Sequence, residues 1–104
     1  MELNQYQAFT RTTVVYPKHD AISYTLYGLM SEIGEIADLF KKEIRDRKPT
    51  GDDTLIRELG DVLYYVARLS DELDYDLERV AQANINKLTD RQNRGTIHGS
   101  GDYR

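Results

Sequence analysis

The chain has 104 residues, of which 31% are charged and 39% are hydrophobic, and its formal net charge is −4. This length is typical of one domain, so we expect residues 1–104 to form a single domain with a flexible tail at 93–104. The acidic balance argues against broad nucleic-acid binding, which depends on neutralising phosphates with basic side chains.

Composition excludes several kinds of chemistry and suggests a location. Without cysteine the chain can form no disulfide, thiolate nucleophile or Cys-type zinc site, and its two histidines argue against a histidine-rich metal site. No apolar run reaches the roughly 18 residues of a membrane span, and the N-terminus has no signal-peptide pattern. We therefore expect a cytoplasmic protein without a membrane partner.

Apolar spacing and helix-breaking residues predict four helices and no strand. Tyr16-Pro17 should end the first helix, because proline disfavours a helical conformation in the residue before it, and Pro49-Thr50-Gly51 should end the second. The expected N-caps are Asp20, then Asp52 or Asp53, then Asp76. The expected helices cover about 2–15, 21–47, 53–73 and 76–92.

The second and third predicted helices carry apolar residues at intervals of three and four, which is typical of a helix with one buried face. We expect these stripes to form the core of an all-α helical bundle of about four helices. The stripe residues are Ile22, Leu26, Leu29, Ile33, Ile36, Phe40 and Ile44 in the second helix, and Leu55, Leu59, Val62, Val66, Leu69 and Leu73 in the third.

Two acidic pairs occupy these same helices. Glu32 and Glu35, then Glu58 and Asp61, are each three residues apart, so both carboxylates of a pair leave one face of a helix. Acids on a solvated face usually have a basic residue three or four positions away, and here only Arg57 stands at such a position, before Asp61. Two facing pairs would form the all-oxygen cage that a hard cation such as Mg2+ requires.

At about 100° per residue, Glu32 and Glu35 lie roughly 90–150° around the second helix from its predicted core side. They share that side with Gly28, whereas Glu58 and Asp61 border the apolar stripe of the third helix. Acids beside a core lose part of their hydration, which increases the cost of leaving them without a counter-charge. A bound cation would lower that cost.

The last predicted helix and the tail carry a group of basic and amide side chains. Asn84, Lys87 and Arg91 are spaced by three and four, and Arg94 and Arg104 flank the glycine-rich tail RGTIHGSGDYR. An ordinary solvated helix face followed by a frayed terminus would account for this pattern. A flexible basic flap that holds phosphate oxygens would account for it as well.

Taken together, these motifs resemble the MazG-like, all-α nucleoside triphosphate pyrophosphohydrolases. The resemblance rests on E-x-x-E, then E-x-x-D within ELGDVLYYVARL, then NINKLTDR and the tail pattern RG-x-I-x-G-x-GD-x-R, and it extends from about residue 20 to the C-terminus. Ser31 stands where the family motif often has a further glutamate, so this chain lacks a carboxylate at that position.

The resemblance implies hydrolysis of (deoxy)nucleoside triphosphates to the monophosphate and pyrophosphate with Mg2+ or Mn2+. It implies that the catalytic and metal-binding residues are Glu32, Glu35, Glu58 and Asp61. It further implies that Asn84, Lys87 and Arg91 contact phosphate or sugar and that Arg94 and Arg104 clamp phosphates. Similar proteins are homodimers or homotetramers, sometimes with sites shared between subunits.

Two alternatives stay open at this point. The chain could be a related phosphoribosyl-ATP or dUTP pyrophosphatase, which a substrate panel would separate. It could also be a non-catalytic helical module that binds a nucleotide or a partner helix, because regular apolar stripes alone suit such a module.

Overall fold

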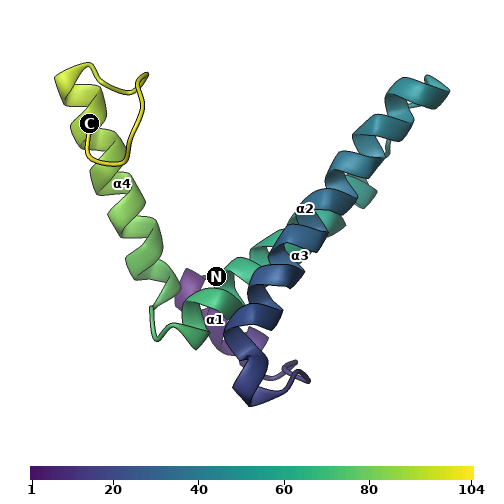
Figure 1. Cartoon of the computed structure of the whole chain (residues 1–104), viewed down its shortest axis with the longest axis horizontal. Helices are drawn as coiled ribbons and strands as arrows, with labels where there is room; N and C mark the ends of the chain where they lie inside the picture. Colours follow the sequence, from purple (N-terminus) through teal and green to yellow (C-terminus); the bar gives the residue numbers. More distant parts are fainter.

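The helices of the protein form a V with one double arm and one single arm (Figure 1). The computed structural model describes residues 1–104, and all of its regular structure is helical. The elements are α1 (Leu3–Arg11), a short 3-10 helix η1 (Lys18–Asp20), α2 (Ala21–Asp46), α3 (Asp52–Glu72) and α4 (Leu77–Arg94). The prediction of an all-α chain with four helices and no strand is confirmed. No helix combines the length and apolarity needed to cross a membrane.

Most helix ends fall within two residues of the predicted ones, but α1 stops four residues early, at Arg11. The hydroxyls of Thr12 and Thr13 donate to the carbonyl oxygens of Phe9 and Thr10 at 2.7 and 2.9 Å. Such local bonds compete with continuing the helix, which explains why the prediction to residue 15 is too long.

The predicted N-caps are right in position for two helices and wrong for the third. Asp20 and Asp76 are the N-cap residues of α2 and α4, although neither side chain forms a capping hydrogen bond. In α3 the N-cap is Gly51, and Asp52 and Asp53 lie in the first turn. Negative charge in a first turn interacts favourably with the helix dipole.

The two arms differ in how well they are packed. α2 and α3 run antiparallel and side by side, whereas α4 contacts α1 and α3 but not α2 (Figure 1). The radius of gyration is 16.6 Å, whereas a compact domain of this length would have about 13 Å. The open shape leaves the inner and outer faces of both arms without a covering layer.

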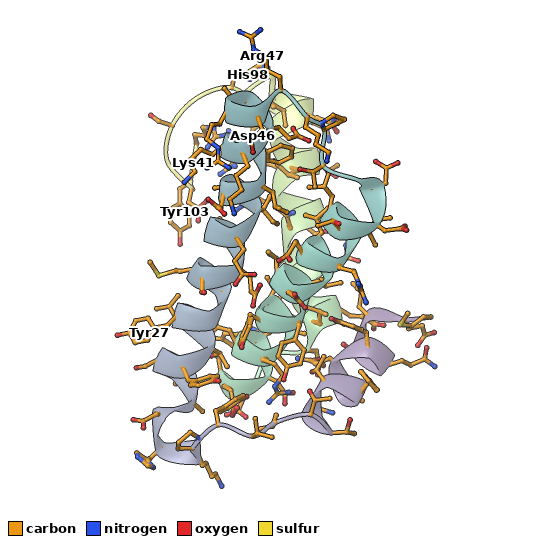
Figure 2. All side chains as sticks on the ribbon, turned by 90° about the vertical axis from the view of Figure 1, so that its right-hand side faces the viewer. Tyr27, Lys41, Asp46, Arg47, His98 and Tyr103 are labelled. Carbon is orange, nitrogen blue, oxygen red and sulfur yellow. The ribbon has the colours of Figure 1, made fainter.

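The side of α2 that packs on α3 is the side that carries Glu32, and this corrects the predicted core. Gly28, Leu29 and Glu32 are shielded on this side, while Ile33 is 52% exposed and Ile44 is 82% exposed. A pair of helices can bury only one side of each, so much of both apolar stripes stays in solvent. The stripe residues that prove exposed are Ile22, Leu26, Ile33, Phe40 and Ile44 in α2, and Leu59 and Leu73 in α3. Figure 2 shows that Tyr27 also points outward from α2.

Close packing of the α2–α3 pair depends on Gly28. A Cβ atom there would overlap the ring of Tyr65, whereas a Cβ at Gly34, two turns further along, would meet nothing within 4 Å. Glycine at position 28 therefore lets the two helices approach, and the side chain of Tyr65 fills the space.

We expect Gly28→Ala to destabilise the protein by about 1–3 kcal/mol, because the added methyl group must displace a packed ring. The matched control Gly34→Ala should be neutral or stabilising by up to about 1 kcal/mol, since alanine is the better helix former. Urea unfolding of both variants measures the difference. Equal free energies of unfolding for the two variants would contradict this packing.

Two buried polar side chains join the base of the V. The amide of Gln7 in α1 is 1% exposed; it donates to the carbonyl oxygen of Tyr75 at 2.9 Å and accepts from the backbone N–H of Leu77 at 2.9 Å. Since buried polar groups are stable only when they are hydrogen-bonded, these bonds fix α1 against the turn before α4.

Arg68 of α3 is the second of these side chains and is also almost fully buried. It donates to the hydroxyls of Thr10 and Tyr16 and forms ion pairs with Asp71 and Glu72. Burial and a hydrogen bond to Glu72 raise the pKa of Tyr16 to about 12. This polar cluster is not predicted by the sequence pattern, because its members lie in segments far apart along the chain.

Candidate metal centre

Three of the four predicted carboxylates meet between α2 and α3. Glu32 comes from α2, and Glu58 and Asp61 come from successive turns of α3; one oxygen from each lies within 4.8 Å of the others. Because the helices are antiparallel and packed through Gly28, the middle of α2 lies opposite the first half of α3. The predicted meeting of acids from both helices is therefore present in the structure.

The fourth acid, Glu35, lies beside this group rather than within it. It is not one of the three residues whose oxygens converge, yet it lies close enough to raise the pKa values of both Glu32 and Glu58. Its place one turn after Glu32 puts it at the edge of the cluster.

The electrostatics of the cluster are unfavourable for carboxylates alone. Burial, followed by the charges of Glu35 and Asp61, raises the pKa of Glu32 to about 7. Burial and the nearby Glu35 also raise the pKa of Glu58. These shifts mean that the negative charges repel one another and that their hydration is incomplete.

Two carboxylate oxygens in the cluster have no partner at all. Oε2 of Glu32 and Oε2 of Glu58 are buried and accept no hydrogen bond. A buried acceptor without a partner costs free energy, and a buried charge costs more. Oxygen-only ligands without a counter-charge are the donor set that Mg2+ or Ca2+ takes in proteins, so the residues present fit a hard divalent cation.

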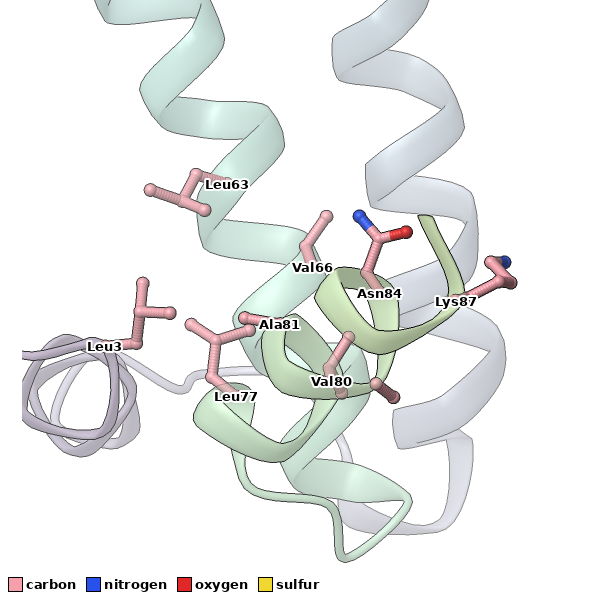
Figure 3. A pocket seen from close by; sticks show the side chains of 9 residues that line it. Leu3, Leu63, Val66, Leu77, Val80, Ala81, Asn84 and Lys87 are labelled. Atoms are coloured by element: carbon pink, nitrogen blue, oxygen red, sulfur yellow. The ribbon is translucent and has the colours of Figure 1, made fainter. Parts of the chain in front are cut away.

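The side chains that the sequence assigns to the substrate lie elsewhere in the chain. Asn84 and Lys87 line an open groove of about 540 Å³, whose other lining residues are apolar (Figure 3). This groove lies between α4 and the elements α1 and α3, as the labelled Leu3 and Val66 show. Since α4 does not contact α2, a single chain does not bring this helix and the α2 side of the cluster together.

The arginines predicted to clamp phosphates donate their hydrogen bonds to other groups of the same chain. Arg91 is 5% exposed and donates to the carbonyl oxygens of Gly101 and Asp102. Arg94 pairs with Asp90 on α4 and also donates to the terminal carbonyl oxygen. The guanidinium group of Arg104 donates to the carbonyl oxygens of Thr96, Ile97 and Gly101. Residues 95–104 therefore fold back on α4, and the flexibility of this tail stays a prediction.

One charged residue near these cations was not identified from the sequence. The carboxylate of Asp102 lies 3.1 Å from Nζ of Lys87. Asp102 belongs to the GD-x-R part of the tail motif. Its contact with Lys87, fifteen residues away, depends on two chain reversals that the sequence pattern does not specify.

Comparison with known proteins agrees with the site. The model of the MazG nucleotide pyrophosphohydrolase domain matches residues 21–96, which include all four acids. The chain is 42% identical to the gene 37 protein of Mycobacterium phage L5 over 114 aligned residues, which cover the whole of both chains. No solved structure matches. The match supports nucleotide pyrophosphohydrolase activity in general, and the chain belongs to the MazG nucleotide pyrophosphohydrolase family.

Proposed function

We propose that the protein hydrolyses (deoxy)nucleoside triphosphates to nucleoside monophosphate and pyrophosphate with Mg2+. The observation that carries this proposal is the carboxylate cluster of Glu32, Glu58 and Asp61, with two buried oxygens that lack a partner. It lies within the range that matches the MazG domain.

In this proposal Glu32, Glu58 and Asp61 hold the cation between α2 and α3. A bound Mg2+ would supply positive charge to phosphate oxygens and would lower the pKa of the attacking water. Glu35, beside the converging oxygens rather than among them, is free to accept a hydrogen bond from the attacking water and to orient it. The helix pair keeps these side chains fixed, so little reorganisation is needed during the reaction.

The test is pyrophosphate release from a panel of ribo- and deoxynucleoside triphosphates that includes dUTP, together with phosphoribosyl-ATP. The proposal expects Mg2+-dependent release that a chelator abolishes, and the ranking of kcat/KM identifies the base and sugar preference. A strong preference for phosphoribosyl-ATP or for dUTP would assign the chain to one of the related pyrophosphatases. No release from any substrate by the folded protein would favour the binding module.

The exposed apolar stripes support a homodimer or homotetramer. Ile33, Phe40 and Ile44 of α2 and Leu59 of α3 are each between 46% and 82% exposed. Large apolar side chains that stay exposed on two packed helices favour an interaction surface. A second copy of the chain would cover it and would also fill the open V. We propose that residues 1–104 of each copy act as one domain, since α1 packs against α3 and α4.

The shape of one chain also supports a site shared between copies. Asn84 and Lys87 lie on α4, which does not touch α2, whereas a substrate that binds at both places needs them close together. A partner copy lying in the V would bring its α4 to the carboxylate cluster. In this arrangement Asn84 and Lys87 contact phosphate or sugar, while Arg91, Arg94 and Arg104 reach phosphate only if the tail rearranges.

Mixing two defective variants tests the shared site. We expect Asp61→Asn and Lys87→Ala each to be poorly active and their refolded mixture to recover about a quarter of the wild-type activity, because half of the dimers pair unlike subunits and each of these holds one intact site. The control is the same mixing of Asp61→Asn with Glu58→Gln, which damages the same half of the site and should recover nothing. No recovery in the first mixture would mean that each site is built from one chain.

A further inference from the structure

The folded tail brings an acidic side chain onto the cationic face of α4. Gly95 ends α4 with φ of 69° and Gly101 reverses the chain again with φ of 86°. These left-handed conformations are ones that glycine adopts at no steric cost. The two reversals return the chain along α4 and set Asp102 next to Lys87 and Arg91.

Asp102 makes two different kinds of contact there. Its main-chain carbonyl oxygen accepts from Nη2 of Arg91 at 2.6 Å. Its carboxylate Oδ1 lies 3.1 Å from Nζ of Lys87 and 3.6 Å from Nη2 of Arg91. The carboxylate thus bridges two cations, which is the position that an oxygen of an anionic ligand would take.

The main-chain contact and the carboxylate contact should differ in strength. The side chain of Arg91 is 6% exposed, so its bonds to the tail are shielded from water, whereas that of Asp102 is 74% exposed and that of Lys87 is 40% exposed. Exposed ion pairs contribute little free energy and are weakened by salt. The carboxylate can therefore leave Lys87 while the backbone of the tail stays bound to Arg91.

We propose that Asp102 is an internal competitor that occupies the anion-binding position at Lys87, beside the buried Arg91, until an oxyanion of the ligand displaces it. This inference rests on the proposed function only in taking that ligand to be a polyphosphate. Because the competitor carries one charge and is held weakly, a polyphosphate with several charges displaces it more readily than a ligand with a single charge. The tail therefore weakens the binding of singly charged anions at α4 more than that of polyphosphates.

Binding of inorganic pyrophosphate, measured by calorimetry with chelator present so that the carboxylate cluster holds no cation, tests the inference without turnover. Asp102→Asn removes the charge but keeps the main-chain carbonyl that Arg91 binds. We expect this variant to bind pyrophosphate about two- to five-fold more tightly than wild type, the range that loss of one exposed ion pair gives. Asp102→Glu, which restores the charge, should return the affinity to the wild-type value.

Two controls separate competition from a general charge effect. Asp46→Asn removes an equally charged exposed acid, paired with Arg45 at the end of α2, and should leave the affinity unchanged. In a Lys87→Ala background, Asp102→Asn should not change the affinity for pyrophosphate, because the competition acts through Lys87. The inference would be overturned if Asp102→Asn bound pyrophosphate as tightly as wild type, more weakly, or not at all. If Asp102→Asn binds more tightly but no triphosphate is hydrolysed, the proposed function fails alone; if hydrolysis occurs with unchanged pyrophosphate binding, the inference fails alone.

Discussion

Replacing Asp61 with asparagine is expected to lower Mg2+-dependent turnover at least about 100-fold while the protein stays folded. A bound cation contributes several kcal/mol of charge stabilisation to phosphate chemistry, and each 1.36 kcal/mol is a factor of ten in rate. The substitution removes one of the three carboxylates that converge in the cluster. Asp61 is exposed, so little packing is lost.

The same substitution should raise the melting temperature of the metal-free protein. The charge of Asp61 contributes to the raised pKa values of Glu32 and Glu58, so its removal relieves repulsion within the cluster. The combination of lower activity and higher metal-free stability separates a functional acid from a structural one. Turnover is measured as kcat/KM for pyrophosphate release, and melting is followed by circular dichroism in chelator.

Asp53→Asn is the matched control for this experiment. Asp53 is an exposed acid in the first turn of the same helix, outside the cluster, and its replacement should leave turnover unchanged. Wild-type activity in Asp61→Asn would refute its assignment as a metal ligand. Equal loss in the Asp53 variant would trace the effect to α3 as a whole.

The metal-free protein is expected to lose stability as the pH rises from 5 to 8. The pKa of Glu32 is about 7 in the folded protein against an ordinary value of 4.5, so between these values the folded state holds a proton that the unfolded state has released. The stabilisation is complete below the unfolded pKa and is lost as the pH passes the folded one. The expected loss is on the order of 1–3 kcal/mol, because solvent screening reduces the full effect of the shift.

The carboxyl groups with lowered pKa values act outside this window. The lowered pKa values of Asp38 and Asp71 give stability that is lost only as the pH falls below about 4. Glu58 has a raised pKa and therefore acts in the same direction as Glu32. A decline between pH 5 and 8 thus reports on the carboxylate cluster.

Urea unfolding in chelator at fixed protein concentration measures this dependence, since the stability of an oligomer varies with concentration. Glu32→Gln should flatten the curve, because glutamine carries no charge at any of these pH values. Addition of Mg2+ should reverse the trend in the wild type, since metal ligands must be deprotonated to bind. A metal-free wild type that is as stable at pH 8 as at pH 5 would contradict the electrostatics of the cluster.

The parts of the molecule that sequence could predict are those set by neighbours along the chain. Helix positions follow from apolar spacing and from breakers such as Pro17, and the acidic pairs follow from a three-residue spacing that holds on any helix. The meeting of Glu32 with Glu58 was predictable, because two long helices joined by a short turn pack antiparallel.

The parts that could not be predicted depend on contacts between distant segments. α2 has two sides on which it could pack; the more apolar one was predicted to be the core, but the side with Gly28 faces α3 because Tyr65 fits there. The divergence of α4 depends on Gln7 binding the turn before that helix. Whether Lys87 faces a ligand or Asp102 depends on how the tail folds back.

The measurement that tests the central claim most directly is 31P NMR of the products formed from one nucleoside triphosphate by wild type and Asp61→Asn, each with Mg2+ and with chelator. The proposed function predicts equal amounts of nucleoside monophosphate and pyrophosphate in the sample of wild type with Mg2+, and little product in the other three. Orthophosphate and nucleoside diphosphate in place of these products, or the same product from Asp61→Asn or in chelator, would contradict a carboxylate-held cation that directs pyrophosphate release.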